Sequence, residues 1–199
     1  AVANNTLAKE PVLIDAFTYA KENNKKVHFL GLVSDGGVHS HTSHLRGLIT
    51  ASQEYGLENV FVHAFTDGRD VDPKSGKQYI QDLEDFMAPT TAKLASVVGR
   101  YYAMDRDKRW ERVKLAYDLV VNGTGKPTQD AVAAIEESYA KDVTDEFIDP
   151  LVVVDATNQP LATIQADDVV IFFNFRTDRG RELTEALSQK DFHEQNMHK

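Results

Sequence analysis

The stretch VHFLGLVSDGGVHSH at residues 27–41 is an apolar run that ends in a polar cluster. Three other runs have the same plan: Val60–Thr66 leads into DGRD, Ala95–Gly99 into RYYAMDR, and Val169–Phe175 into RTDR. These runs, like Val27–Ser34, are apolar without strict alternation. They therefore predict strands that are covered on both faces, as in a parallel sheet.

Helix signals alternate with these runs along the chain. Apolar residues at helical spacing predict helices at Glu10–Asn23, His41–Tyr55, Lys77–Met87, Asp107–Val121, Thr128–Tyr139 and Arg179–Leu187, and a further short strand is expected at Leu151–Val154. Strands that alternate with helices of this length need crossover connections, which predicts an α/β fold whose mostly parallel sheet has helices on both faces. Residues 140–165 are less regular and leave room for an antiparallel edge hairpin.

The composition is that of an ordinary globular protein. Of its 199 residues, 42% are hydrophobic and 27% are charged, which suits one large domain or two small ones. The net charge of −9 argues against a nucleic-acid or anionic-membrane surface as partner. The sequence has no cysteine, no membrane-spanning apolar run and no signal-peptide pattern, so a cytoplasmic protein is expected.

The polar clusters carry most of the chemistry that the sequence offers. The carboxyl ends of parallel strands lie at one edge of a sheet, where open α/β sheets bind ligands. The residues expected at this edge are Arg69, Arg100, Arg106, Arg176 and Arg179, together with His39 and Asp70. Guanidinium groups match phosphate and carboxylate in a bidentate manner, so this edge predicts a site for a small anion.

Other features favour a structural interpretation. His28 and His63 lie inside apolar runs, as core histidines do. His41 and His44 share the spacing of one helix face, but no acidic residue lies at regular spacing nearby, so no metal site is expected within this chain. GTGKPT lacks the pattern of a phosphate-binding P-loop and is interpreted as a loop between helices. Arg109 is expected on a solvated helix face.

Five motifs occur in a fixed order: SDGGVHSH (34–41), TDGRD (66–70), VGRYYAMDRDKRWER (98–112), NGTGKPT (122–128) and FFNFRTDRGRE (172–182). In this order they closely resemble the cofactor-independent (2,3-bisphosphoglycerate-independent) phosphoglycerate mutases, over essentially the whole chain. The resemblance implies a two-domain enzyme that interconverts 3-phosphoglycerate and 2-phosphoglycerate. Residues 1–199 would form a single domain, the inserted phosphotransferase domain that binds the substrate.

The resemblance also implies roles for residues at the sheet edge. His39 matches the histidine beside the transferred phosphoryl group, and Arg69 with Asp70 matches the pair that meets the glycerate hydroxyls, Asp70 being the proton-transfer group. The remaining substrate-binding positions are Arg100, Arg106, Arg176, Thr177, Asp178 and Arg179. The phosphoryl-accepting serine and two divalent metal ions, usually manganese, belong to the family's phosphatase-like domain, which is absent here.

Three hypotheses on function are therefore open. The first is a substrate-binding domain of a phosphoglycerate mutase that is inactive alone, because the nucleophile and the metal ligands are missing. The second is a non-catalytic binding module for a small phosphorylated or carboxylated metabolite. The third is a self-contained metal hydrolase that uses Asp35, Asp67 and the histidines between His39 and His44.

Overall fold

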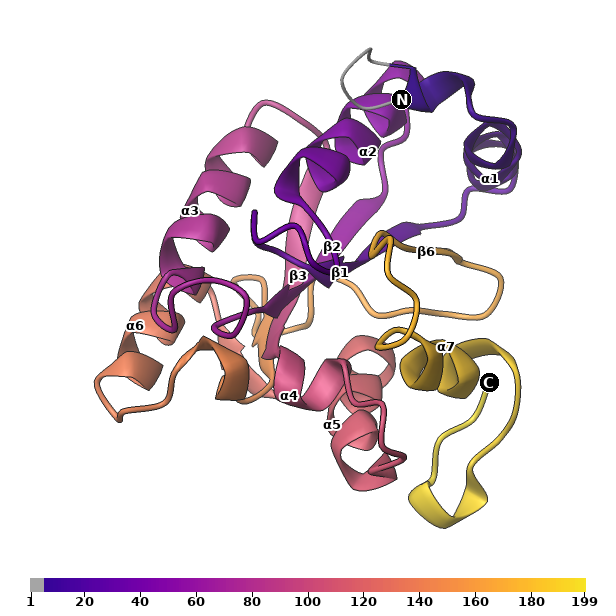
Figure 1. Cartoon of the computed structure of the whole chain (residues 1–199). Coiled ribbons are helices and arrows are strands. Elements are labelled where there is room, and N and C mark those ends of the chain that lie inside the picture. Colours follow the sequence, from indigo (N-terminus) through magenta and orange to yellow (C-terminus); the bar gives the residue numbers. More distant parts are fainter. Residues whose placement is uncertain (1–5) are drawn as a thin grey trace.

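The computed structural model describes residues 6–199 and contains a six-stranded sheet with helices on both faces (Figure 1). The strand order is β4-β5-β3-β2-β1-β6. The strands are β1 (Val27–Leu32), β2 (Val60–Thr66), β3 (Ala92–Gly99), β4 (Lys126–Thr128), β5 (Leu151–Val153) and β6 (Val169–Phe172). The predicted α/β class is confirmed.

The helices form two layers around the sheet. One face is covered by α1 (Pro11–Glu22), α2 (Thr42–Glu54), α3 (Gly76–Met87) and α6 (Ala131–Tyr139), and the other by α4 (Arg100–Ala103), α5 (Trp110–Asn122) and α7 (Arg181–Ser188). Among residues 6–199, single 3₁₀ turns lie at Leu7–Lys9, Asp145–Phe147 and His193–Gln195. Each layer packs a separate cluster of buried apolar side chains against the sheet.

The four predicted strands are parallel neighbours. β1 pairs with β2 on one side and with β6 on the other, and β2 pairs with β3. Their carboxyl ends therefore lie at one edge, as the sequence predicts. Four strands have other bounds than expected: β3 begins at Ala92, and β1, β5 and β6 end earlier, at Leu32, Val153 and Phe172. After β6, the Asn174 side chain accepts the Leu32 amide (N–Oδ1 3.0 Å).

The less regular region, residues 140–165, contains an antiparallel pairing, but this pairing does not lie at the edge of the sheet. β5 runs antiparallel to β3 and lies inside the sheet, and a single antiparallel bridge joins Val154 to Pro160 beyond it. The edge strand is β4, which pairs in parallel with β5. The expectation that GTGKPT is a loop is therefore wrong for its last three residues, because pairing with β5 outweighs the low strand propensity of a segment with Pro127.

The segment between β3 and α5 also differs from the prediction. The chain turns directly into the short helix α4, and α5 begins at Trp110 rather than at Asp107. The buried Asp105 carboxylate accepts the backbone amides of Asp107 (Oδ2–N 3.0 Å) and Arg109 (2.9 Å), which holds these residues in a loop before the helix. Arg109 thus flanks α5 instead of lying on its face.

Gly31 permits the close approach of the segment that follows β6. Its φ is +157°, and a Cβ atom there would lie 2.8 Å from both Asn174 Oδ1 and the Phe173 ring. This contact brings the loop after β6 against the loop after β1. The two loops are also joined where the amides of Phe175 and Arg176 donate to the His39 carbonyl (2.9 and 3.3 Å).

A chain of polar side chains crosses three strands inside the sheet. Ser96 Oγ lies 2.7 Å from His63 Nδ1, His63 Nε2 lies 3.0 Å from His28 Nδ1, and His28 Nε2 lies 3.1 Å from Asp168 Oδ2. Both histidines are fully buried, as the sequence predicts for core residues. Burial lowers the pKa of His63 well below its usual value, and burial also lowers the pKa of His28 although Asp168 opposes the shift.

Because both pKa values are lower in the folded chain, the unfolded chain binds protons more readily below pH about 6.5, so stability is expected to fall as the pH decreases from 7 to 5.5. One such histidine contributes at most about 1.4 kcal/mol per pH unit. The measurement is the urea unfolding free energy at several pH values for the wild type and for His63→Leu. The unfolding free energy of the variant should depend less steeply on pH. Equal slopes for the two proteins would contradict a lowered pKa of His63.

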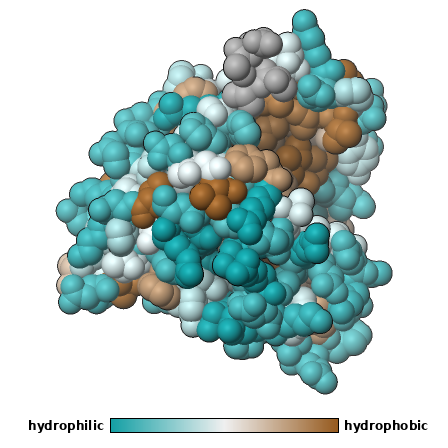
Figure 2. Space-filling model, viewed as in Figure 1, coloured by the Kyte–Doolittle hydropathy of each residue, from teal (hydrophilic) through white to brown (hydrophobic). Residues whose placement is uncertain are grey.

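Within residues 6–199, no helix combines the length and the apolar character that a membrane crossing requires. On the face drawn in Figure 2, strongly hydrophilic residues gather above α4 and α5, where the loops after the parallel strands meet, and apolar residues gather between α1 and α2.

Candidate functional site

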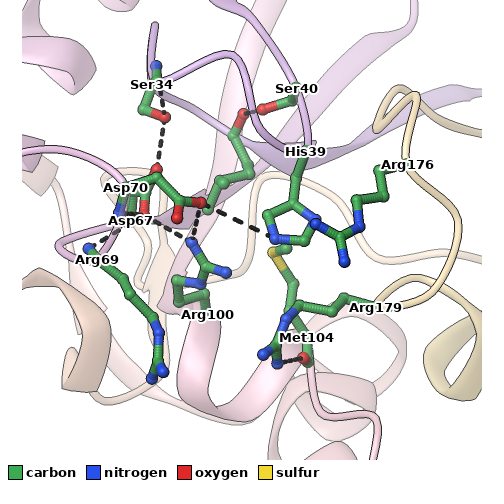
Figure 3. A network of polar contacts seen from close by, with 12 residues as sticks. Ser34, His39, Ser40, Asp67, Arg69, Asp70, Arg100, Met104, Arg176 and Arg179 are labelled. Carbon is green, nitrogen blue, oxygen red and sulfur yellow. Dashed lines mark hydrogen bonds and ion pairs between the residues drawn. The ribbon is translucent and has the colours of Figure 1, made fainter.

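The loops after β1, β2 and β6 and the helix after β3 meet at the carboxyl edge of the sheet. They bring together His39, Asp70, Arg100, Arg176 and Arg179, as Figure 3 shows. The sequence predicts this convergence, because each of these residues follows a strand of the parallel sheet. The structure adds the carboxylates that organise the cluster.

Asp67, the first residue after β2, lies at the centre of this arrangement. Its Oδ1 accepts the amides of Arg69 (3.1 Å) and Asp70 (2.9 Å), and its Oδ2 accepts the Ser34 hydroxyl (2.6 Å). Burial by itself would raise the pKa of Asp67, but these hydrogen bonds and the Arg100 guanidinium lower it, so the carboxylate stays charged. Asp67 therefore folds the DGRD turn and joins it to the loop after β1.

Arg100 is buried beneath the site, with 3% of its surface exposed. Its Nη1 lies 2.7 Å from Asp67 Oδ1 and 2.6 Å from Asp70 Oδ2. Both carboxylates contact this one nitrogen and raise the pKa of Arg100 against the effect of burial. Arg100 is thus placed to hold Asp70 in position, and much of its charge is already compensated.

His39 lies between two carboxylates. Its Nε2 is 3.9 Å from Asp70 Oδ2, and its Nδ1 is 3.8 Å from Asp178 Oδ1. Burial and the nearby Arg100 charge lower the pKa of His39, although Asp70 and Asp178 oppose the shift, so the ring is neutral near pH 7. Among the described residues, His39 Nδ1 is buried without a hydrogen-bond partner, which leaves polar capacity inside the site.

Asp178 also pairs with two arginines of the site. Its carboxylate lies 3.0 Å from Arg176 Nε and 3.2 Å from Arg106 Nη1. These contacts balance two positive charges at the mouth of the site, where about half of each arginine side chain is exposed. The neighbouring Thr177 is exposed.

Arg179 differs from the other four arginines because the described residues include no carboxylate in an ion pair with it. Its Nη1 donates to the Met104 carbonyl at 3.1 Å. Burial lowers the pKa of Arg179, and the charges of Arg106 and Arg100 lower it further. This guanidinium would gain most from a bound anion.

Arg69 lies at the rim and pairs with Glu146 (Nη1–Oε1 3.2 Å) on the turn before β5. Asp67, Asp70, Glu146 and Asp178 therefore compensate the charges of four of the five arginines. An open pocket of about 480 Å³ lies between β6 and α7, next to the site. Arg176 and Thr177 belong to both the lining of this pocket and the site.

The residues proposed for a metal hydrolase do not form a cluster of ligands. Asp67 is occupied by Ser34, Arg100 and two amides, and His41 Nδ1 accepts the Ser43 amide at 3.1 Å as the cap of α2. Within residues 6–199, the one group of three ligand-type side chains close enough for a metal ion lies in the C-terminal segment, outside this site. The geometry at the sheet edge fits an anion better than a metal ion.

Comparison with known proteins places the chain in a family. All of its residues, 1–199, match the family model described as the BPG-independent PGAM N-terminus (iPGM_N). The chain belongs to this family. The resemblance carried by the five motifs is thereby confirmed.

Family members with high identity carry one name. The 2,3-bisphosphoglycerate-independent phosphoglycerate mutases of Flavobacterium johnsoniae and Parabacteroides distasonis are 79% identical over 199 residues and 57% identical over 198 residues. Each alignment covers 100% of this chain and 39% of the relative. The chain thus spans about two fifths of the length of these curated relatives and corresponds to the iPGM N-terminal domain.

A solved structure has the same fold. It is described as Leishmania mexicana phosphoglycerate mutase at low cobalt concentration, and it superimposes with a TM-score of 0.90 at 32% sequence identity. The match covers 96% of this chain and 37% of that chain. The fold of this chain, with its mostly parallel sheet, is therefore also present in the matching part of that structure.

Proposed function

We propose that this iPGM N-terminal domain binds phosphoglycerate at the carboxyl edge of its sheet, as the substrate-binding part of a phosphoglycerate mutase. The observation that carries the proposal is that Arg176 and Arg179 lie beside the neutral His39, and that Asp178 joins Arg106 to the same group. A glycerate phosphate has two anionic groups, a phosphate and a carboxylate. Arginines from two separate loops suit two such groups, because each guanidinium can hold one of them in a bidentate manner.

In this proposal, the anion takes over contacts that Asp178 makes in the structure. Asp178 holds Arg106 and Arg176 in place, and Arg179 supplies a charge that is not paired with a carboxylate. A ligand phosphate beside Arg179 would relieve its repulsion from neighbouring arginines. Arg69 and Thr177, at the rim, would contact the rest of the ligand.

We assign proton transfer at the glycerate hydroxyls to Asp70 and His39. Arg100 fixes the Asp70 carboxylate, and the neutral His39 ring can accept a proton at one nitrogen and donate one at the other. The phosphoryl group would pass to a serine of the phosphatase-like domain and return to the other hydroxyl, with two divalent ions, usually manganese, supplying charge stabilisation in that domain. The parent enzyme would act in cytoplasmic glycolysis and gluconeogenesis, without nucleic acid or membrane partners.

The second candidate function is a non-catalytic binding module for a small phosphorylated metabolite. The same arginines favour it, because they bind anions whether or not a reaction follows. The two candidates differ in what happens when the remaining part of the parent enzyme is added. Restored interconversion of the two phosphoglycerates would support the mutase proposal, and unchanged simple binding would support the module.

The direct test is a calorimetric titration of the 199-residue chain with 3-phosphoglycerate, with and without manganese. We expect binding that does not need the metal, and no interconversion by the chain alone. Glycerate and inorganic phosphate are the matched probes, because each has one of the two anionic groups and should bind more weakly. Equal affinity for phosphate and 3-phosphoglycerate, or absence of binding, would contradict the proposal.

A further inference from the structure

The segment Asp191–Lys199 forms a small hairpin on the surface of α5. Phe192 and Met197 face each other across an antiparallel bridge, in which the Phe192 amide donates to the Met197 carbonyl at 2.9 Å. Asn196 takes the left-handed conformation at the turn (φ +53°), as asparagine tolerates well. This polar segment is therefore folded against the domain.

Three contacts fix this hairpin to the domain. The Phe192 ring packs on Trp110 with 4.1 Å between ring centroids, and Met197 is fully buried. The Tyr117 hydroxyl accepts the His198 amide at 2.9 Å and donates to the His198 carbonyl. The backbone on both sides of the turn is thus held in place.

The bridge places three polar side chains near one another. Since Phe192 faces Met197, Asp191 faces His198, and His193 directly follows Phe192 at the start of the 3₁₀ turn. Phe192 and Met197 pack against the domain, whereas Asp191, His193 and His198 are all exposed. One ligand-type atom of each lies within 4.8 Å of the others.

The spacing of these atoms leaves room for an ion. Within residues 6–199, no ion pair joins Asp191 to either histidine at 4.0 Å or less, so these side chains are not already bonded to one another. For three atoms within 4.8 Å of each other, a point exists at most about 2.8 Å from all of them (4.8 Å divided by √3). Zinc binds such ligands at about 2.0–2.2 Å, which small rotations of exposed side chains can reach.

We propose that Asp191, His193 and His198 form a binding site for a divalent transition-metal ion of the zinc and cobalt class. Two imidazole nitrogens and one carboxylate oxygen match the preferred donors of these ions, and water completes the coordination. Supporting contacts orient two of the ligands: Asp191 Oδ1 accepts the Lys199 amide at 3.0 Å, and His198 Nε2 lies 3.2 Å from Asn196 Oδ1.

The charges around the hairpin are compatible with a cation. Lys190, next to Asp191 in the sequence, is engaged by Glu185 at 2.8 Å. The site departs from the expectation that this chain holds no metal, which rested on the histidines at 39–44. The site is also separate from the arginine cluster, so a test of metal binding is independent of the phosphoglycerate proposal.

The chain contains a built-in reporter for this site. Its single tryptophan is Trp110, which packs on Phe192 between two of the proposed ligands. Paramagnetic Co²⁺ bound in the hairpin should quench the Trp110 fluorescence in a saturable way. With no cysteine in the chain, thiolates cannot compete for the ion.

The experiment uses the untagged 199-residue chain freed of metal by a chelator. Calorimetry with Zn²⁺ and fluorescence with Co²⁺ should each show one saturable site. His193→Ala and His198→Ala should each weaken binding at least tenfold, while His44→Ala, which changes the other histidine cluster, should change it less than twofold. Asp191→Asn provides a further ligand variant if a histidine variant does not fold.

Three results would overturn the proposal. The first is the absence of saturable Zn²⁺ binding to the wild type at millimolar concentration. The second is binding that survives in the folded His193 and His198 variants or disappears in His44→Ala. Zinc binding without Co²⁺ quenching of Trp110 would also place the ion elsewhere.

Discussion

Replacing Asp67 with alanine is expected to lower the free energy of unfolding by about 3–5 kcal/mol, the range for removing one partner of a buried ion pair. Asp67 is 1% exposed and contacts the Arg100 guanidinium. Its loss would leave the buried Arg100 with Asp70 alone and would also leave the Ser34 hydroxyl and two backbone amides without their acceptor.

The measurement is urea denaturation followed by circular dichroism. Asp15→Ala is the matched control, because Asp15 is an exposed aspartate on α1 and its replacement should change stability by less than about 0.5 kcal/mol. A loss below about 1 kcal/mol for Asp67→Ala would mean that Asp67 does not organise the loops of the site.

The double substitution Arg176→Ala/Arg179→Ala is expected to weaken 3-phosphoglycerate binding about a hundredfold to ten-thousandfold. Each charge-assisted hydrogen bond lost contributes about 1.5–3 kcal/mol, and tenfold in affinity corresponds to about 1.4 kcal/mol. Stability should change little, because half of the Arg176 side chain is exposed and Arg179 is repelled by neighbouring arginines.

Calorimetry and the melting temperature measure both effects in the same samples. Arg109→Ala is the control, because Arg109 pairs with Asp105 and Asp107 outside the cluster. If Arg109→Ala weakened binding as much as the double variant, the anion site would be assigned to the wrong arginines. Unfolding of the double variant would contradict the claim that these two arginines serve binding and not the fold.

The parallel sheet could be predicted from the sequence, because long apolar runs indicate strands that are buried on both faces. The meeting of the strand ends at one edge then follows from the parallel arrangement. β4 could not be predicted, since a three-residue strand containing Pro127 has no recognisable pattern of its own and exists through its pairing with β5. The start of α5 could not be predicted either. Residues from Asp107 onward fit a helical pattern, but the amides of Asp107 and Arg109 donate to the Asp105 carboxylate instead, and the helix begins after them.

The ion pairs between the carboxylates and the arginines of the site could largely not be predicted from the sequence. Arg69 pairs with Glu146 across 77 residues of sequence and Arg106 with Asp178 across 72, so no local spacing signals these contacts. Asp67 lies within a predicted motif, but its sequence neighbours indicate a turn or a metal ligand equally well. Only the folded chain shows that Asp67 forms an ion pair with Arg100 and accepts the amides of Arg69 and Asp70.

The most direct test of the central claim is a crystal structure of the 199-residue chain soaked with 3-phosphoglycerate. We expect the phosphate or the carboxylate of the ligand within hydrogen-bond distance of Arg176 and Arg179, with a hydroxyl beside His39 or Asp70. Well-defined ligand bound elsewhere, with the pairs of Asp178 to Arg106 and Arg176 unchanged, would contradict the account.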